Sequence, residues 1–194
     1  ANHLSGGAGD DLLAGLGGAD VLDGGDGFDT VIYQSAPAGM VVNLAAGTDS
    51  DGDQLISIEA VTGSRFDDVL TAGNDGSTLN GSNGDDVLNG GTGNDVLRGG
   101  AGADTMAGGA GADRFVYASI SDSGTAGGTR DRITDFSRSD GDLIDVSAID
   151  ADPGTAGDQP LTFLGTGVFT GSAGEMRVVG LSSGVSIIAI DLNG

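Results

Sequence analysis

The sequence predicts an all-β fold in which short parallel strands stack into a flattened spiral. Three observations support this prediction. A nine-residue pattern of small residues, aspartate and one large apolar residue recurs in residues 6–32 and 63–116. Glycine makes up 39 of the 194 residues, far above its ordinary usage. No segment shows a convincing helical periodicity, so the apolar residues indicate short strands joined by glycine-rich turns.

The composition is strongly acidic and favours aspartate. Of the 29 acidic residues only Glu59 and Glu175 are glutamate, and the seven basic residues are all arginine, so the formal charge is −22. A preference for the shorter acid is typical of turns and of loops that bind cations through oxygen. The charge argues against nucleic acid or an anionic membrane as a direct partner. Cysteine is absent, and no apolar run approaches the roughly 20 residues of a membrane span.

The nonapeptides form two blocks in different registers. The first block, 1–32, holds three copies, and the second, 63–116, holds six copies in one unbroken frame. The eighth residue of each copy is apolar, and the sixth is aspartate in every copy except the one with Ser77. The last copy of the first block starts 39 residues before the second block, which is not a multiple of nine. The spacer at 33–62 therefore changes the register.

The spacer and the C-terminal part lack the nonapeptide pattern. Within the spacer we expect short strands at 41–44 and 55–61 around a polar loop. Residues 117–194 predict an all-β cap, because the last repeat would otherwise expose its apolar face. The strands expected in this cap are DRITDF (131–136), LIDVSAI (143–149), LTFLG (161–165), EMRVVG (175–180) and VSIIAIDL (185–192).

The nine-residue period has a physical explanation. Nine residues divide into a six-residue turn and a three-residue strand whose middle, eighth residue points inward. Two units complete one coil with a strand on each face, so a turn lies beside the turn two repeats later, about 4.8 Å away. Asp86 is then expected between Asp68 and Asp104, and Asp95 beside Asp113. Like charges stacked so closely repel each other, and this repulsion predicts a bridging cation.

Calcium is the cation that suits these residues best. It takes 6–8 oxygens from carboxylates and backbone carbonyls, both of which an aspartate-bearing glycine turn supplies. Magnesium fits less well because it requires strict octahedral geometry and holds its waters. Zinc, copper and iron favour histidine or cysteine, and the chain has one histidine and no cysteine.

Three other features have simpler explanations. The stretch DSDGDQLISIEA at 49–60 hints at an EF-hand loop, but Gln54 and Ala60 stand where that loop needs glycine and glutamate, so we expect a solvated loop. Asp20 has no aspartate-bearing turn at the right offset, so we expect it in a solvated turn. His3 is the single histidine, which excludes a Ser–His–Asp triad within the chain.

The nonapeptide pattern GGxGxDxUx, in which U is a large apolar residue, resembles the RTX repeat, which forms a calcium-bound parallel β-roll. The stretch NLAAGTDSDGDQLISIEAVTGS resembles the spacer between RTX blocks. The sequence from RDRITDF to EMRVV is similar to the C-terminal domain of serralysin-type metalloproteases. The resemblance implies a parallel β-roll of two right-handed RTX stacks with a C-terminal β cap, holding about four to six calcium ions.

The resemblance also implies where the ions bind. Each ion lies between the turns of repeats n and n+2. The earlier turn supplies the carbonyls of its second and fourth residues, the later turn those of its first and third, and both supply the sixth-position aspartate. The implied sites are Gly7, Gly9, Asp11, Gly24, Asp26 and Asp29; Ser82, Gly84, Asp86, Gly99, Ala101 and Asp104; Gly91, Gly93, Asp95, Gly108, Ala110 and Asp113; and, as a fourth, Ser64, Phe66, Asp68, Gly81, Asn83 and Asp86.

Two further pairings are expected to be weaker. One lacks a carboxylate because Ser77 occupies the sixth position of its earlier turn. The other would join the turn at residues 99–104 to an aspartate of the expected cap. Their members are Gly73, Asp75 and Ser77 with Gly90, Thr92 and Asp95, and Gly100, Gly102 and Asp104 with Asp122, Asp135 or Asp142.

The functional expectation follows from the resemblance. It implies a non-catalytic, calcium-binding module of a Gram-negative bacterial protein exported by type I secretion, which folds outside the cell and stabilises a neighbouring enzyme or adhesin domain. The HExxH motif of serralysins does not occur in the chain. The alternative is a polyuronate-binding module of a secreted polysaccharide-modifying enzyme. We expect residues 1–5 to lie inside a longer protein, and the last strand and secretion signal to follow residue 194.

Overall fold

The computed structural model describes residues 1–124, 128–149, 162–163, 168, 170, 172, 175–180 and 186–191. These residues form strands, turns and bends, and the all-β prediction is confirmed. Within this described part, no helix is long and apolar enough to cross a membrane. The chain divides into two compact units, Ala1–Asp145 and Val146–Gly194.

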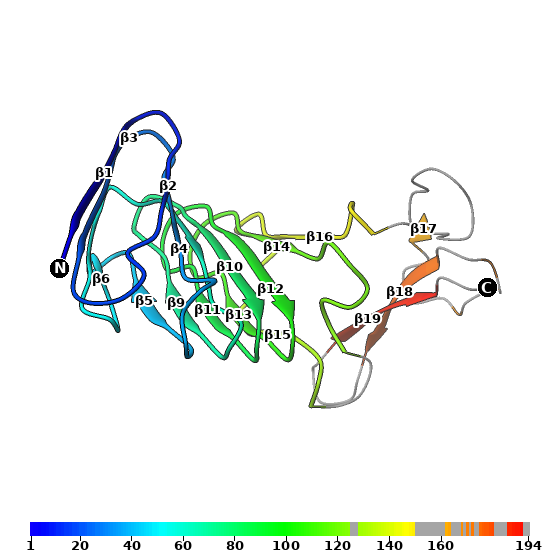
Figure 1. Ribbon diagram of the computed structural model, residues 1–194. Coiled ribbons are helices and arrows are strands. Elements are labelled where there is room, and N and C mark those ends of the chain that lie inside the picture. Colours follow the sequence, from blue (N-terminus) through cyan, green and yellow to red (C-terminus); the bar gives the residue numbers. More distant parts are fainter. Residues whose placement is uncertain are drawn as a thin grey trace. The chain divides into compact units, whose positions relative to one another are not determined.

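The first unit is a two-sheet roll whose sheets are built almost entirely from parallel neighbours (Figure 1). The larger sheet has the order β1 (His3–Ala8), β3 (Val21–Asp26), β7 (Gln54–Ile56), β6 (Thr48–Asp49), β5 (Val41–Asn43), β9 (Val69–Thr71), β11 (Val87–Asn89), β13 (Thr105–Ala107) and β15 (Arg132–Ile133). The smaller sheet has the order β2 (Leu12–Leu13), β4 (Thr30–Ile32), β8 (Ala60–Thr62), β10 (Thr78–Asn83), β12 (Val96–Ala101), β14 (Arg114–Val116) and β16 (Leu143–Asp145).

The register of the strands confirms a coil of two nonapeptides. Leu88 pairs with Leu70 on one side and with Met106 on the other, and Leu97 pairs with Phe115 on the opposite sheet. All five side chains have no exposed surface. The eighth residues therefore form the core between the sheets, as their alternation with outward-facing neighbours predicts. One apolar side chain per repeat makes this core narrow.

The spacer joins the two blocks into one continuous stack. Strand β8 pairs with β4 of the first block and with β10 of the second, so the two stacks that we expected share both sheets. The larger sheet gains β7, β6 and β5 from the spacer, and β6 is antiparallel to both of its neighbours.

The expected strand at 55–61 is wrong as a single element. It is divided between β7 and β8, which belong to different sheets. The chain crosses over at residues 57–59, where Ser57 has a φ of 49°. A positive φ of this kind breaks an extended strand and turns the chain towards the other sheet.

The roll continues beyond the last nonapeptide. Strands β15 and β16, which we expected in a cap starting at residue 117, pair in parallel with β13 and β14 and add a rung to each sheet. The second unit contains a separate sheet of β17 (Thr162–Phe163), β18 (Glu175–Gly180) and β19 (Ser186–Asp191), with β18 and β19 antiparallel. The remaining parts of the strands expected at 161–165 and 185–192 lie outside the described residues.

Truncation of a core side chain tests this packing. The substitution Leu88→Ala is expected to lower the free energy of unfolding by about 2–5 kcal/mol, because it removes a fully buried side chain and leaves a cavity. Val87→Ala is the matched control, since Val87 faces outward and is 37% exposed. Urea unfolding at a fixed calcium concentration measures both variants. Equal losses in the two variants would contradict the assignment of the inner and outer faces.

Candidate metal centres in the turn columns

The six-residue turns of the nonapeptides form a column along each edge of the roll. Column I contains the turns that lead from the smaller sheet into the larger one, and column II contains the turns that lead back. Each sixth residue therefore faces the sixth residue of the turn one coil away. Column I comprises turns 15–20, 63–68, 81–86 and 99–104, and column II comprises turns 6–11, 24–29, 72–77, 90–95 and 108–113.

One oxygen of each sixth-position carboxylate connects consecutive turns. Asp86 Oδ1 accepts the amide of Asp68 at 2.7 Å, and Asp104 Oδ1 accepts the amide of Asp86 at 2.9 Å. In column II, Asp113 Oδ1 accepts the amide of Asp95 at 2.9 Å. The predicted stacking of Asp86 with Asp68 and Asp104, and of Asp95 with Asp113, is thus confirmed. These charge-assisted bonds fix the register of each coil on the next.

The second oxygen of these carboxylates is buried without a partner. A buried carboxylate oxygen that lacks a partner costs free energy unless a proton or a cation satisfies it. Within the described part of the chain, the Oδ2 atoms that are buried and accept no hydrogen bond belong to Asp11, Asp20, Asp29, Asp86, Asp95, Asp104, Asp113 and Asp131.

Backbone carbonyls surround the same positions. A methyl group on Gly6 would lie 2.6 Å from both Asp11 Oδ2 and the Gly24 carbonyl oxygen, so these two oxygens converge beside Gly6. A methyl group on Gly81 would likewise collide with Asp86 Oδ2 and would lie 2.6 Å from the Gly99 carbonyl oxygen. The turns that begin at Gly6, Gly63, Gly81 and Gly90 thus bring their carboxylates towards the first carbonyl of the turn one coil later.

The turns need an unusual backbone to present these carbonyls. In seven of the nine turns, all in the described part, the second and fourth residues have positive φ. Glycine adopts this conformation without strain, and Gly7 and Gly9 are examples at 103° and 104°. Leu16 adopts it as well, with a φ of 70°. The turn therefore imposes the conformation even where the side chain opposes it. We call such turns open turns.

The first three sites implied by the sequence fall between open turns. For the first of them, a methyl group on Gly25 of the later turn would collide with the Gly7 carbonyl oxygen, and one on Gly27 would collide with the Gly9 carbonyl oxygen. The corresponding carbonyl contacts occur between Ser82 and Gly100 and between Gly91 and Gly109. The structure therefore brings together residues of each predicted set.

The fourth implied site has a different geometry. Ser64 and Phe66 are absent from the positive-φ residues, and the Ser64 amide donates to Asp68 Oδ2 at 2.7 Å. The other oxygen of Asp68 accepts the Met40 amide at 2.6 Å. The turn with Ser77 is similar, since Ser77 Oγ accepts the Gly73 amide at 3.0 Å. We call these two turns closed turns, because their sixth side chains bond to their own backbone and leave less for a cation.

Asp20 does not lie in a solvated turn, so that expectation is wrong. Its residue is 3% exposed, and its amide donates to Asp53 Oδ1 at 2.7 Å. Asp53 is 4% exposed and belongs to the stretch that we expected to be a solvated loop. The spacer folds back so that Asp53 occupies the place of the missing aspartate, 33 residues after Asp20. The repeat places partner aspartates 18 residues apart, so the sequence pattern does not identify Asp53 as the partner of Asp20.

The last rungs use aspartates from beyond the nonapeptides. Asp131 Oδ1 accepts the amide of Asp104 at 3.0 Å, whereas the sequence suggests Asp122, Asp135 or Asp142 as the partner of Asp104 in a calcium site. Asp142 holds the equivalent position in column II, where its Oδ1 accepts the amide of Asp113 at 3.1 Å. The sequence DRITDF predicts the strand of this rung. It contains no pattern that identifies Asp131 as the aspartate that continues column I.

The buried carboxylates are hard to ionise without a cation. Burial raises the pKa of Asp86 and of Asp131 to about 7, and that of Asp95 and Asp104 to about 6. Neighbouring carboxylates raise the pKa of Asp86 further, whereas the hydrogen bond that its Oδ1 accepts from the Asp68 amide lowers it. The negative charge of the columns therefore opposes folding at neutral pH.

This set of oxygens fits calcium. No group of three or more His, Asp or Glu side chains that could hold a metal occurs among the described residues. Each position between open turns instead combines two carboxylates with backbone carbonyls, the hard oxygen ligands that calcium accepts in flexible numbers. The unsatisfied Oδ2 atoms are the atoms that such an ion would contact.

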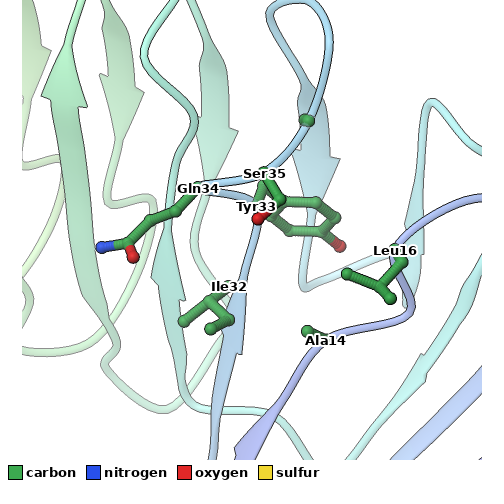
Figure 2. A pocket seen from close by; sticks show the side chains of 7 residues that line it. Ala14, Leu16, Ile32, Tyr33, Gln34 and Ser35 are labelled. Atoms are coloured by element: carbon green, nitrogen blue, oxygen red, sulfur yellow. The ribbon is translucent and has the colours of Figure 1, made fainter.

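A small pocket of the roll lies beside turn 15–20 of column I, which contributes Leu16 to its lining. It is lined by Ala14, Leu16, Ile32, Tyr33, Gln34, Ser35 and Ala36 (Figure 2). None of these lining side chains is acidic, so the pocket lacks the ligands of a cation site.

Comparison with known families agrees with the geometry of the columns. The family described as the RTX calcium-binding nonapeptide repeat (4 copies) matches residues 1–31, 62–97 and 80–115. No curated protein matches the chain.

The raised pKa values predict that the calcium-free roll is more stable at low pH than at neutral pH. A carboxylate with a folded pKa near 6 or 7 and an unfolded pKa of about 3.9 binds more protons when folded. Its contribution to stability is therefore present below about pH 4 and is lost as the pH rises through 6 to 7. Circular dichroism of calcium-stripped protein should show strand signal growing from pH 7 to pH 4. A decrease of that signal over this range would contradict the assignment.

Proposed function

We propose that this chain, whose nonapeptide blocks are RTX calcium-binding repeats, is a non-catalytic module of a protein that a Gram-negative bacterium exports by type I secretion. The module folds when it meets calcium outside the cell. One observation carries the proposal: the buried Oδ2 atoms of the columns converge with backbone carbonyls of the next coil. Calcium supplies charge neutralisation and coordination at these points, and the chain supplies the oxygens.

The proposed ions bind most strongly between consecutive open turns. The strongest candidates are the three sites that end on Asp29, Asp104 and Asp113. The site that pairs Asp68 with Asp86 is weaker, because Asp68 already accepts bonds from Ser64 and Met40. With the pairings at the ends of the columns, the total is about four to six ions.

Calcium binding is coupled to folding by electrostatics and chain entropy. A charge of −22 and 39 glycines oppose compaction of the free chain. Each ion removes two negative charges from a column, and its binding free energy becomes folding free energy. Extracellular calcium modules have dissociation constants of roughly 10⁻⁴–10⁻³ M, so bacterial cytosol leaves the chain unfolded and the outside folds it. The export machinery thus receives an unfolded chain.

The folded roll stabilises a neighbouring domain of the same polypeptide, which is an enzyme such as a serralysin-type metalloprotease or an adhesin. Residues 117–194 act as the C-terminal cap in this proposal. The rungs β15 and β16 support it, because they cover the last nonapeptide strands with backbone partners and with Ile133 and Ile144 against the core.

A calcium titration tests the coupling. Strand signal in circular dichroism at neutral pH is expected to appear cooperatively as calcium rises into the range of roughly 10⁻⁴–10⁻³ M, and magnesium should not replace it. Strand content that chelator leaves unchanged would overturn the folding switch.

A pair of single substitutions tests the proposed ligands. Asp95→Asn replaces a buried carboxylate whose Oδ2 has no hydrogen-bond partner in the described part of the chain, and it should remove one bound calcium per chain. Asp75→Asn makes the same chemical change at an exposed position of a closed turn, and the ion count should stay as in the unaltered chain. Equilibrium dialysis with radioactive calcium gives both counts. Equal counts for the two variants would remove Asp95 from the proposed ligands.

A further inference from the structure

The end of the spacer is a degenerate nonapeptide that the sequence pattern hides. Residues 54–62 are in frame with the second block, and Val61 at the eighth position is 1% exposed. The Ala60 amide donates to the Asp29 carbonyl at 2.9 Å, just as the Thr30 amide donates to the Asp11 carbonyl at 2.9 Å. The coil after turn 24–29 therefore continues column II, and Glu59 takes the place of the sixth residue.

Glu59 makes the contact that aspartate makes elsewhere in the columns. Its Oε2 accepts the Asp29 amide at 2.9 Å, while Asp29 Oδ1 accepts the Asp11 amide at 2.8 Å. Ile56 pairs with Asp23, and Ala60 pairs with Thr30. The three residues 57–59 therefore take the place of the six-residue turn 24–29. The additional methylene of glutamate gives this side chain a longer reach from the shorter connection. Glu59 is one of only two glutamates among the 29 acids of the chain.

Ser57 supplies the carbonyl that the first residue of a turn normally supplies. A methyl group on Gly24 would collide with both Asp29 Oδ2 and the Ser57 carbonyl oxygen, in the way that one on Gly6 would meet Asp11 Oδ2 and the Gly24 carbonyl. Ser57 holds this orientation at a φ of 49°, which is unfavourable for a residue other than glycine. The two oxygens converge on the same small space beside Gly24.

The other half of the position is an open turn. Gly25 and Gly27 have φ values of 101° and 149°. Asp29 has no exposed surface, and its Oδ2 accepts no hydrogen bond from any described residue. A buried carboxylate oxygen aimed at a second carbonyl oxygen is unfavourable unless a cation or a proton lies between them.

We propose that turn 24–29 and the spacer together form a further calcium site. Its ligands are the carbonyls of Gly25, Gly27 and Ser57 and the carboxylates of Asp29 and Glu59. This inference rests on the proposed function, since it assumes that the columns bind calcium. Asp29 then lies between two ions, one shared with Asp11 and one with Glu59, and the second ion ties the spacer to the first block.

The test is the number of calcium ions bound at saturation, measured by native mass spectrometry on the full chain. Glu59→Gln keeps an oxygen that can accept the Asp29 amide but removes the charge, and one ion fewer is expected. Glu175→Gln is the matched control, because it changes the other glutamate, in the second unit, and should lose none. Asp29→Asn removes a ligand of both neighbouring ions, and two fewer are expected.

The outcomes separate the two proposals. If the unaltered chain binds no calcium, the proposed function fails. If it binds calcium and Glu59→Gln binds as many ions, the function stands and the spacer site is overturned. Should Glu59→Gln lack strand signal at saturating calcium, a crystal structure of the unaltered chain decides. Anomalous calcium density between Asp29 Oδ2 and the Ser57 carbonyl supports the site, and its absence overturns it.

Discussion

In the open turns, the carboxylate of the sixth residue accepts the amide of the sixth residue one coil earlier, as Asp29, Asp86, Asp95, Asp104 and Asp113 do, and this bond sets how these coils lie on their neighbours. It places carboxylates at the spacing of parallel strands, about 4.8 Å, where their charges repel. The core offers limited compensation, because each repeat contributes one inward side chain. The stability of the roll therefore depends on what neutralises its edges, and the calcium-binding character of the repeats follows from that constraint.

The two edges are not uniform along the roll. At the junction between spacer and second block, the protein satisfies its own polar groups: Ser64 and Met40 donate to Asp68, Gly73 donates to Ser77, and Tyr33 donates to Asp49 at 2.6 Å. On either side of this junction the turns are open and their carboxylates keep an unsatisfied oxygen. The centre of the roll is thus held by contacts within the chain, whereas the flanking coils have the geometry of cation sites.

The spacer is part of the roll rather than a linker between two rolls. Strand β8 takes one place in the smaller sheet, while β5, β6 and β7 take three places in the larger one. The spacer also supplies an acid to each column, Asp53 beside Asp20 and Glu59 beside Asp29. Although the spacer interrupts the nonapeptide pattern, each column therefore still has a carboxylate in the coil that follows the first block.

The sequence by itself determined the features that depend on local periodicity. The inward position of Leu88, the stacking of Asp86 on Asp68, and the two-repeat coil all follow from the spacing of residues within one frame. The tertiary structure decided which acids continue the columns where that frame is interrupted. Asp131 and Glu59 reach their places through connections of irregular length, and only the packing of those connections sets which carboxylate meets the next amide. The division of 55–61 between two sheets has the same origin, because a change of sheet depends on the backbone of one residue in its folded surroundings and leaves no periodic trace.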